Sequence, residues 1–387
     1  MERVSSIFGQ ILKFFPRAVF DAAVKHHQAD KHAKGMTCWT QFIALMFCHL
    51  GGARSLREII GGLAASEGKL KHLGVERAPV RSTLAYANQH RPWQLYRTVF
   101  EELVKVCQGE ARDKQRKFRF QHPLLTLDST VIPVCVEMFE WARYVKTKGA
   151  VKVHAVLDNR SILPQYAVIT DGKTADVKVA RGLKFEPGTI VVMDRGYEDH
   201  DWWRKLTADG VFFVTRLKDS TGYGIVEERP QPADPIQRDE VILLASEKES
   251  GNPMWLRRIE VWLEDKQEPM VFVTNHLRLA GSTVAAIYRD RWQIELFFKA
   301  IKQSLRIKTF IGTSENAVQT QVWTALIAMV LLRYLQLRST WKWSLSNLVA
   351  LLRYQLFVYR DLWAWINQPF RPPVELDAPQ LAFAFQP

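Results

Sequence analysis

A change in sequence texture near residue 120 constrains the fold more than any other feature. From there to residue 217, short runs rich in β-forming residues follow one another, and helical segments separate the later runs. The runs are LLTLDSTVIPVCV, VKVHAVL, QYAVIT, TIVVMD and VFFVTRL, with DVKVARGL and HDWWRKLTADG between the later ones. Strands that alternate with helices along a chain predict an α/β sheet flanked by helices.

The segments on either side of this region give the expected domain organisation. Residues 1–110 carry apolar residues at helical spacing and predict an all-helical N-terminal domain, and a basic linker follows at 111–120. We expect the α/β domain at 121–340, a β-strand insertion within it at about 218–275, and a helical C-terminal tail at 341–387. A chain of 387 residues is longer than a typical single domain, which agrees with this division.

The charge of the chain favours a polyanionic partner. Its formal net charge is +13, and a field of that sign attracts nucleic acid before an anionic membrane. A basic surface without such a partner is the alternative. The apolar run Ala325–Leu332 is much shorter than the ~20 residues that cross a bilayer, and the first residues contain no secretion signal. We therefore expect a soluble, cytoplasmic protein with no membrane partner.

The cysteines give no sign of a metal or disulfide framework. Cys38, Cys48, Cys107 and Cys135 form no CxxC pair and have no closely spaced histidine pattern. We expect them to be reduced thiols in the core.

Two aspartates follow apolar runs and are candidates for chemistry. Thr189–Met193 is a continuous apolar run, as expected for a strand covered on both faces, and it ends in Asp194. Leu124–Leu127 likewise runs into Asp128. Ligands of open α/β sheets bind beyond the carboxyl ends of such strands. For each aspartate alone, a helix cap or a turn is the alternative.

The segment YRDRWQIELFFKAIKQ predicts one long helix with a polar stripe. At about 100° per residue, Tyr288, Arg291, Glu295 and Lys302 fall on one narrow stripe beside an apolar stripe. Glu295 is therefore expected at the border between core and cleft. The alternative is a solvated surface helix, on which an Arg291–Glu295 pair at i,i+4 contributes only ~0.3 kcal/mol.

Two carboxylates on strands and one on a helix indicate a site for two hard cations. Mg²⁺ prefers oxygen ligands and binds few protein carboxylates together with phosphate oxygens and water. Two such ions, about 3.5–4 Å apart, would activate an attacking hydroxyl and stabilise a leaving oxygen in a phosphoryl displacement. Asp128, Asp194 and Glu295 are the candidate ligands, and Arg291 and Lys302 could hold DNA phosphate beside them.

Taken together, these motifs resemble the insertion-sequence-4 family of DDE transposases. Tyr288, Arg291, Glu295 and Lys302 are similar to the Y-R-E-K signature of that family. LDST and MDRGY resemble its first and second aspartate motifs, and FFVTRLK resembles its next strand. The long gap between Asp194 and Glu295 agrees with the β insertion that these enzymes carry. The resemblance covers roughly residues 120–340.

The resemblance implies an RNase H-like mixed sheet, dependence on two Mg²⁺ ions with Mn²⁺ as a substitute, and cut-and-paste movement of an insertion sequence through a hairpin intermediate. It carries over Asp128, Asp194 and Glu295 as catalytic metal ligands. It also implies binding of double-stranded DNA, both inverted repeats and target, by a homodimer that pairs the two ends. The candidate DNA contacts are Tyr288, Arg291, Lys302, Lys299 and Trp292.

Other readings of particular segments stay open. Trp202 and Trp203 are expected to pack in the core. Trp292 is also expected to pack in the core, and stacking on a DNA base is the alternative for it. The segment Arg81–Thr83 could begin a DNA-recognition helix or be purely structural. The basic residues Arg112–Arg119, with Phe118 among them, could track phosphates or form a solvated connector.

Two other functions compete with transposition. A transposase-derived protein that binds DNA without cutting it is one, and the intact carboxylate set argues against it. A glycoside hydrolase that uses two of the carboxylates is the other. It leaves the net charge of +13 without an explanation.

Overall fold

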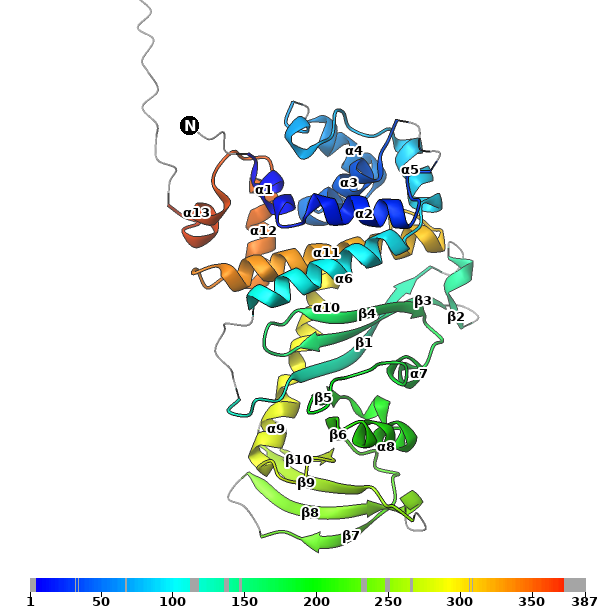
Figure 1. Ribbon diagram of the computed structural model, residues 1–387, viewed down its shortest axis with the longest axis vertical. Helices are drawn as coiled ribbons and strands as arrows, with labels where there is room; N and C mark the ends of the chain where they lie inside the picture. The colour runs from blue at the N-terminus through cyan, green and yellow to red at the C-terminus, as the bar shows by residue number, and fades with distance from the viewer. Residues whose placement is uncertain are drawn as a thin grey trace, which may run out of the picture.

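The computed structural model describes residues 5–371 with short gaps, and these residues form a mixed sheet flanked by helices (Figure 1). The gaps are residues 32, 34, 67, 112–117, 136–138, 146–147, 231–234, 248–250, 265–266, 306 and 308. Most of the predicted basic linker, and the part of the predicted tail at 372–387, therefore lie outside the described residues.

The first third of the chain is helical. Its helices are α1 (Ile7–Lys13), α2 (Arg17–His26), α3 (Cys38–Gly51), α4 (Leu56–Ala64), α5 (Arg81–His90) and α6 (Gln94–Ala111). Helix α3 begins where the Thr37 side chain accepts a hydrogen bond from the backbone N–H of Thr40, and it ends at Gly52, whose φ of 76° suits glycine. Three helices from the end of the chain join this layer: α11 (Glu315–Arg338), α12 (Leu345–Gln355) and α13 (Leu362–Asn367).

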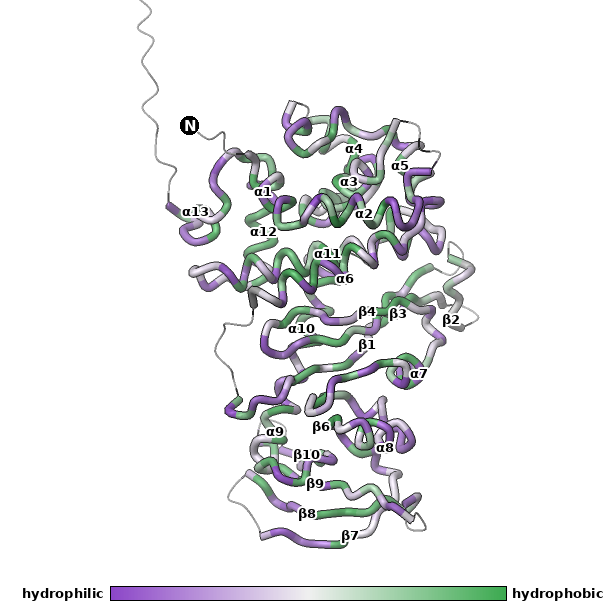
Figure 2. The backbone as a smooth tube through the Cα atoms, in the orientation of Figure 1, coloured by the Kyte–Doolittle hydropathy of each residue, from purple (hydrophilic) through white to green (hydrophobic). Residues whose placement is uncertain are grey.

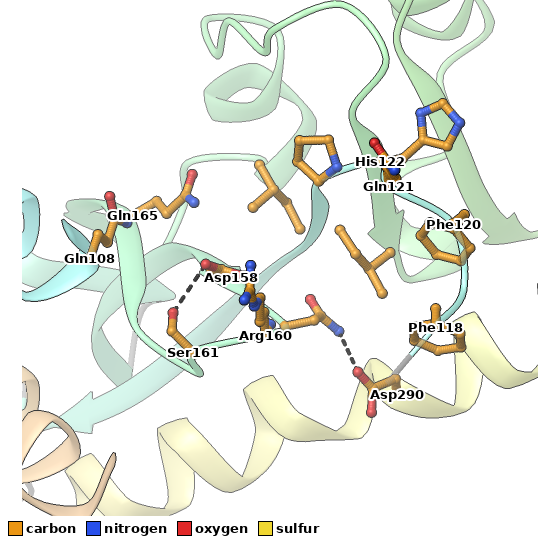
Figure 3. A pocket seen from close by; sticks show the side chains of 14 residues that line it. Gln108, Phe118, Phe120, Gln121, His122, Asp158, Arg160, Ser161, Gln165 and Asp290 are labelled. Carbon is orange, nitrogen blue, oxygen red and sulfur yellow. Dashed lines mark hydrogen bonds between the residues drawn. The ribbon is translucent and has the colours of Figure 1, made fainter. Parts of the chain in front are cut away.

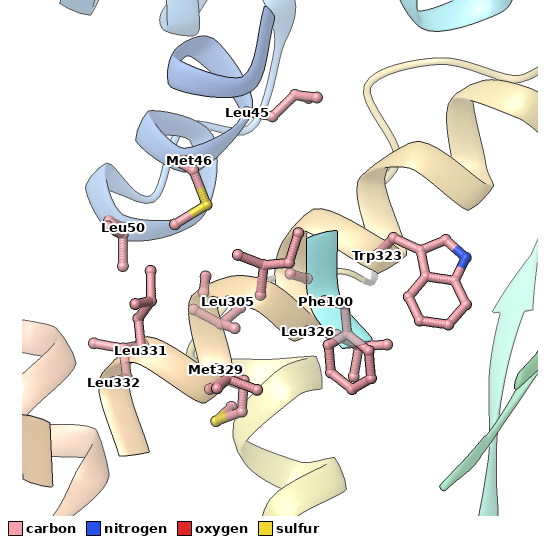
Figure 4. Close-up of a cluster of buried hydrophobic side chains, with 14 of the residues drawn as sticks. Leu45, Met46, Leu50, Phe100, Leu305, Trp323, Leu326, Met329, Leu331 and Leu332 are labelled. Carbon is pink, nitrogen blue, oxygen red and sulfur yellow. The ribbon is translucent and has the colours of Figure 1, made fainter. Parts of the chain in front are cut away.

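Helix α11 forms the centre of the helical layer. Leu45 and Met46 of α3 and Phe100 of α6 belong to the same buried cluster as Leu326 and Met329 of α11 (Figure 4). Helix α11 is long and apolar enough to cross a membrane by length and composition, but 94% of its most apolar window is buried inside the protein. Such burial is typical of a core helix, and Figure 2 shows that the middle of α11 is hydrophobic.

One hydrophobic core joins helices from both ends of the chain. Residues of α1 to α6, of α11 to α13 and of one face of the sheet belong to the same buried cluster. The predicted domain boundaries at 110 and 340 therefore separate segments of sequence whose side chains pack together, and the boundaries remain a prediction.

The sheet contains the strand arrangement of an RNase H-like core. Its strands are β1 (Leu124–Val134), β2 (Arg143–Val145), β3 (Lys148–Asp158), β4 (Pro164–Asp171), β5 (Ile190–Met193), β6 (Phe212–Arg216), β7 (Tyr223–Glu228), β8 (Ile236–Leu244), β9 (Trp255–Leu263) and β10 (Glu268–Thr274). Strand β3 pairs antiparallel with β1 and β4, whereas β5 is parallel to both β1 and β6. The predicted fold class is therefore confirmed. Strands β7 to β10 continue the same sheet, because β10 pairs with β6.

Strand β5 is covered on both faces, as its apolar run predicts. Val191 and Met193 pack in the core that contains Trp202 and Trp203 of α8 (His200–Ala208). Ile190 and Val192 belong to the core on the other face, under α9 (Gly281–Asp290). Helix α7 (Asp176–Ala180) contacts the turn that follows β5. The expectation that Trp202 and Trp203 are core residues is confirmed by their exposures of 2% and 0%.

The prediction of one long helix through Tyr288 is wrong. Helix α9 ends at Asp290, and α10 (Trp292–Gln303) begins after Arg291. The backbone N–H groups of Arg291 and Ile294 bond the carbonyls three residues earlier, at 3.1 Å each, which tightens the chain at the junction. Helix α9 packs on β5, β6, β8 and β10, whereas α10 packs on β1 and α11. Periodicity within the segment cannot detect that its halves pack on different elements.

Two other expectations are corrected by side-chain exposure. Cys38, Cys48 and Cys107 are buried free thiols, but Cys135, which follows the last residue of β1, is exposed. Core packing of Trp292 is also wrong, since its side chain is 56% exposed. The core face of α10 is formed by other residues, namely Ile294, Phe297, Phe298 and Ile301.

Candidate active site

The two predicted aspartates lie on neighbouring parallel strands and face the same way. Leu127 of β1 pairs with Met193 of β5, so Asp128 and Asp194 follow one register position later. Successive side chains of a strand point to opposite faces. Leu124 and Val192 pack in the core under α9. Asp128 is four residues after Leu124, and Asp194 is two residues after Val192. Each aspartate therefore faces the same side of the sheet as α9 and α10.

Arg291, at the junction of α9 and α10, links Asp128 to Glu295. Its Nη1 donates to Oδ2 of Asp128 at 3.3 Å, and its Nη2 donates to Oε1 of Glu295 at 2.6 Å. The side chains of Asp128 and Arg291 are 19% and 15% exposed, whereas that of Glu295 is 35% exposed. The i,i+4 pair that the sequence allows is therefore present, and it also contacts a strand aspartate.

Tyr288 connects the same helices to the second aspartate. Its hydroxyl donates to Oδ1 of Asp194 at 3.3 Å, and its ring packs against Phe272 of β10 with centroids 4.9 Å apart. The guanidinium of Arg291 lies 5.5 Å from the centroid of the Tyr288 ring. The structure thus joins Asp128, Asp194 and Glu295 through Arg291 and Tyr288.

The environment of Asp128 favours its protonated form more than solvent does. Burial, together with the charges of Asp194 and Glu295, raises the pKa of Asp128 to about 6. The backbone N–H of Ser129, 2.8 Å from Oδ1, and the charge of Arg291 act in the opposite direction. Burial lowers the pKa of Arg291, but Tyr288, Asp128 and Glu295 together raise it above its usual value.

The site opens into a pocket of ≈ 400 Å³ that carries lysines at its edge. The pocket is lined by Asp128, Ser129, Thr130, Glu295, Phe298, Lys299, Lys302 and Gln303. Lys299 is exposed and Lys302 is half-buried, and the exposed Trp292 begins the same helix. Lys299 and Lys302 therefore lie beside Asp128 and Glu295.

Carboxylates are suitable ligands for a hard divalent cation, but their present arrangement is not a metal site. Within the described residues, no group of three His, Cys, Asp or Glu side chains is arranged to hold a metal ion. At this site the guanidinium of Arg291 lies between Asp128 and Glu295. A positive group is therefore already stabilised between two of the three carboxylates. Their oxygens are donors of the kind that a divalent cation takes, and a cation between Asp128 and Glu295 would require Arg291 to leave that position.

Sequence reasoning missed three polar residues close to the carboxylates. The Tyr197 hydroxyl is buried, and no described group meets hydrogen-bond geometry with it. Burial raises its pKa, and Asp128 and Asp176 raise it further. Arg216 is the last residue of β6. Burial raises the pKa of Tyr288, and the charge of Arg216 lowers it by a smaller amount. Tyr197 and Arg216 lie within MDRGY and FFVTRLK, whereas Asp176 belongs to no motif.

A second pocket, of ≈ 310 Å³, lies at the start of β1 (Figure 3). Phe118 and Phe120 stack on one side of it, with ring centroids 5.1 Å apart. Asp290 accepts a 3.0 Å hydrogen bond from Asn159 within it. None of the predicted site residues lines this pocket.

The fold and the site define an RNase H-like protein whose two strand aspartates lie just beyond the parallel pairing of β1 and β5, with Glu295 reaching them from α10. Residues 119–331 match the family model described as Transposase DDE domain, and residues 3–76 match a domain of unknown function. The chain belongs to the family of DDE transposases, and it is an enzyme of that class. The predicted resemblance is therefore confirmed at the level of the family, and the glycoside hydrolase alternative is dropped.

The curated relatives carry provisional transposase names. Transposase y4zB of Sinorhizobium fredii is 33% identical over 77% of this chain and 82% of that protein. The transposase of insertion sequence element IS5377 from Geobacillus stearothermophilus is 28% identical over 66% of this chain and 67% of that protein. A transposase of element IS4SA from Synechocystis is 23% identical over 66% of this chain and 71% of that protein.

A solved structure with a related arrangement is the piggyBac transposase synaptic complex with hairpin DNA. It has a TM-score of 0.46 and 7% sequence identity over 96% of this chain and 83% of that chain.

Proposed function

We propose that this transposase cuts DNA at the ends of an insertion sequence and joins those ends to target DNA, with Asp128, Asp194 and Glu295 as its catalytic residues. The observation that carries this proposal is the connection of all three carboxylates through Arg291 and Tyr288. Asp128 and Glu295, which are distant in sequence, line one pocket together with Lys299 and Lys302, and lysines suit a phosphate backbone.

Asp128, Asp194 and Glu295 would hold Mg²⁺, as two ions, with Mn²⁺ as a substitute. When bound, these ions would activate the attacking oxygen and stabilise the oxygen that leaves phosphorus. The protein has to present ionised carboxylates, and Arg291 has to leave its place between Asp128 and Glu295. Once released, its planar guanidinium is suited to a DNA phosphate. Arg291 thus exchanges one kind of anionic partner for another.

The proposed reaction is a series of phosphoryl transfers. A water oxygen bonds to phosphorus at the end of the element, and the 3′ oxygen leaves as a hydroxyl. That hydroxyl then attacks phosphorus of the opposite strand to give a hairpin, and the 3′ oxygen of the flanking DNA leaves. Water attacks the hairpin phosphorus, and the 3′ hydroxyl of the element is released. This hydroxyl finally attacks phosphorus of the target, a 3′ oxygen of the target leaves, and cut-and-paste movement is complete. Lys299, Lys302, Tyr288 and Trp292 would hold the DNA during these steps.

The proposed partner is double-stranded DNA, bound by a homodimer that pairs the two ends in the cytoplasm. In the predicted N-terminal domain, α5 begins at Arg81 and leaves its first three residues exposed. Tyr86, which is 65% exposed, stacks on His90 of the same helix, with ring centroids 4.0 Å apart. This exposed face of α5 supports the proposal that the domain binds the DNA ends.

The experiment that tests the proposed function compares cleavage with binding. Asp128→Asn, Asp194→Asn and Glu295→Gln should each abolish Mg²⁺-dependent nicking of duplexes that carry the sequences flanking the gene. Their DNA affinity should stay within about threefold of wild type. Asp201→Asn, whose side chain is 93% exposed, is the matched control and should cut normally. Cleavage by any of the three variants would remove that residue from the site. A wild-type protein that binds without cutting would favour the inactive alternative.

A further inference from the structure

A polar cluster lies behind Asp128, on the opposite face of β1 from Arg291. Ser129 follows Asp128 in the strand, so its side chain points to the other face, toward α7. Its Oγ donates to Oδ1 of Asp176, the first residue of α7, at 2.7 Å. Its backbone N–H donates to Oδ1 of Asp128 at 2.8 Å. Ser129 therefore connects Asp176 to Asp128.

Two residues of β3 complete this cluster. Lys152 and His154 lie on one face of β3, while Val151, Val153 and Ala155 point to the core on the other face, and His154 is the cross-strand partner of Ser129. The Nζ of Lys152 lies 3.2 Å from Oδ1 of Asp176, and Nδ1 of His154 lies 3.4 Å from the same oxygen. One carboxylate oxygen of Asp176 thus contacts three side chains.

The cluster is fixed by burial and by further hydrogen bonds. The side chains of Lys152 and His154 are only 11% and 2% exposed. Lys152 also donates to the carbonyl of Thr174 at 2.9 Å, and Nε2 of His154 lies 3.0 Å from Oγ1 of Thr170. Burial lowers the pKa of His154 to about 4, so Lys152 is the cation that balances Asp176 at neutral pH. The Asp176 side chain is 31% exposed, and Nδ1 of His154 makes no hydrogen bond among the described residues, so the contacts of Lys152 and Ser129 are what hold Asp176.

We propose that Asp176 is a positioning residue of the active site, which fixes Asp128 in its ligating orientation by holding Ser129 from the reverse face of the sheet. The inference rests on the proposed function, because Asp128 has an orientation to maintain only as a ligand. The groups behind a metal ligand hold it in place, and their loss typically weakens metal binding about 10- to 100-fold. Asp176 would act through Ser129 and touch neither metal nor DNA.

The test measures Mn²⁺ binding to the DNA-free protein by electron paramagnetic resonance, so that it does not depend on catalysis. Ser129→Ala and Asp176→Ala should each weaken binding about tenfold. Ser129→Thr, which keeps the hydroxyl, should restore it. Because the two residues act in series, the double variant should bind no more weakly than the worse single variant. Asp201→Asn, an exposed acidic residue of α8, should bind like wild type.

Folding and the proposed function are controlled separately. Asp176→Ala leaves Lys152 buried without its partner, so circular dichroism has to establish that it folds. Ser129→Ala keeps the Lys152–Asp176 pair and decides the question if Asp176→Ala does not fold. Wild-type Mn²⁺ affinity in folded Ser129→Ala, or independent effects that multiply in the double variant, would overturn the inference. If Asp128→Asn also binds Mn²⁺ like wild type, the proposed metal site itself fails.

Discussion

The Nη2 of Arg291 lies 2.6 Å from Oε1 of Glu295, one turn further along α10, while its Nη1 reaches Asp128 at 3.3 Å. The residue expected to bind DNA phosphate is therefore engaged with two of the expected metal ligands. Both roles use the same guanidinium, which cannot occupy both places at once. Metal binding and the release of Arg291 toward DNA should consequently favour each other.

Removal of the Arg291 charge should increase the affinity of the carboxylates for a divalent cation. We expect Arg291→Gln to bind Mn²⁺ about tenfold more tightly without DNA, because a charge-assisted hydrogen bond of ~1.5 kcal/mol no longer competes. The same variant should bind DNA more weakly. Isothermal titration calorimetry measures the first effect and a filter-binding assay the second. Arg289→Gln, an exposed residue of α9, is the control. Unchanged Mn²⁺ affinity in Arg291→Gln would refute the exchange.

The lysines at the pocket should contribute to the salt dependence of DNA binding. If Lys299 and Lys302 contact phosphates, each alanine variant should reduce the slope of log affinity against log salt by about 0.9. Titrations between low and moderate salt measure this slope. Lys178→Ala, an exposed lysine of α7, should leave the slope unchanged. A full wild-type slope in both pocket variants would exclude them from the interface.

Trp292 should matter for DNA and not for folding. Its side chain is 56% exposed, so Trp292→Ala should change the free energy of unfolding by less than about 0.5 kcal/mol. Loss of base stacking should weaken DNA binding by about 1–3 kcal/mol. Trp203→Ala, at a position that is 0% exposed, should instead cost about 3–5 kcal/mol of stability. Denaturant titration of both variants, with DNA binding by Trp292→Ala, checks these expectations. Normal DNA affinity would reject the stacking role.

His49 should make the stability of the helical layer depend on pH. It lies fully buried between α3 and α11, with Nε2 3.0 Å from Oγ1 of Thr324, and burial lowers its pKa to about 4. The His49 imidazole binds a proton more readily in the unfolded chain than in the folded protein. The contribution of neutral His49 to the free energy of unfolding is therefore complete above pH ~6.5 and declines as the pH falls toward about 4. The loss should approach ~3 kcal/mol.

The comparison of His49→Gln with wild type isolates this contribution. Urea titrations at several pH values should give a His49→Gln curve that declines less steeply between pH ~6.5 and pH ~4. His26→Asn, an exposed position in α2, should follow wild type. Parallel curves for His49→Gln and wild type would show that His49 does not titrate as expected.

The sequence by itself determined the fold class and the chemistry of the candidate site. An apolar run such as Thr189–Met193 can be satisfied only by burial on both faces, and the chain alternates such runs with helices. Asp128 and Asp194 end two of these runs, so local pattern predicts strand ends for both; Asp194 does follow β5, whereas β1 continues past Asp128 to Val134. Four ordered motifs then made the family recognisable. All of this information is local or lies in the order of the motifs, which is why it could be predicted.

Only the tertiary structure decided how those residues meet. The break at Arg291 arises because α9 and α10 pack on different elements, and helical periodicity contains no trace of that packing. The exposure of Trp292 likewise depends on which face of α10 is covered. Asp176 belongs to no motif, and it reaches Ser129 only because the chain brings α7 beneath β1. Contacts between residues far apart in the chain depend on packing, which local sequence patterns do not specify.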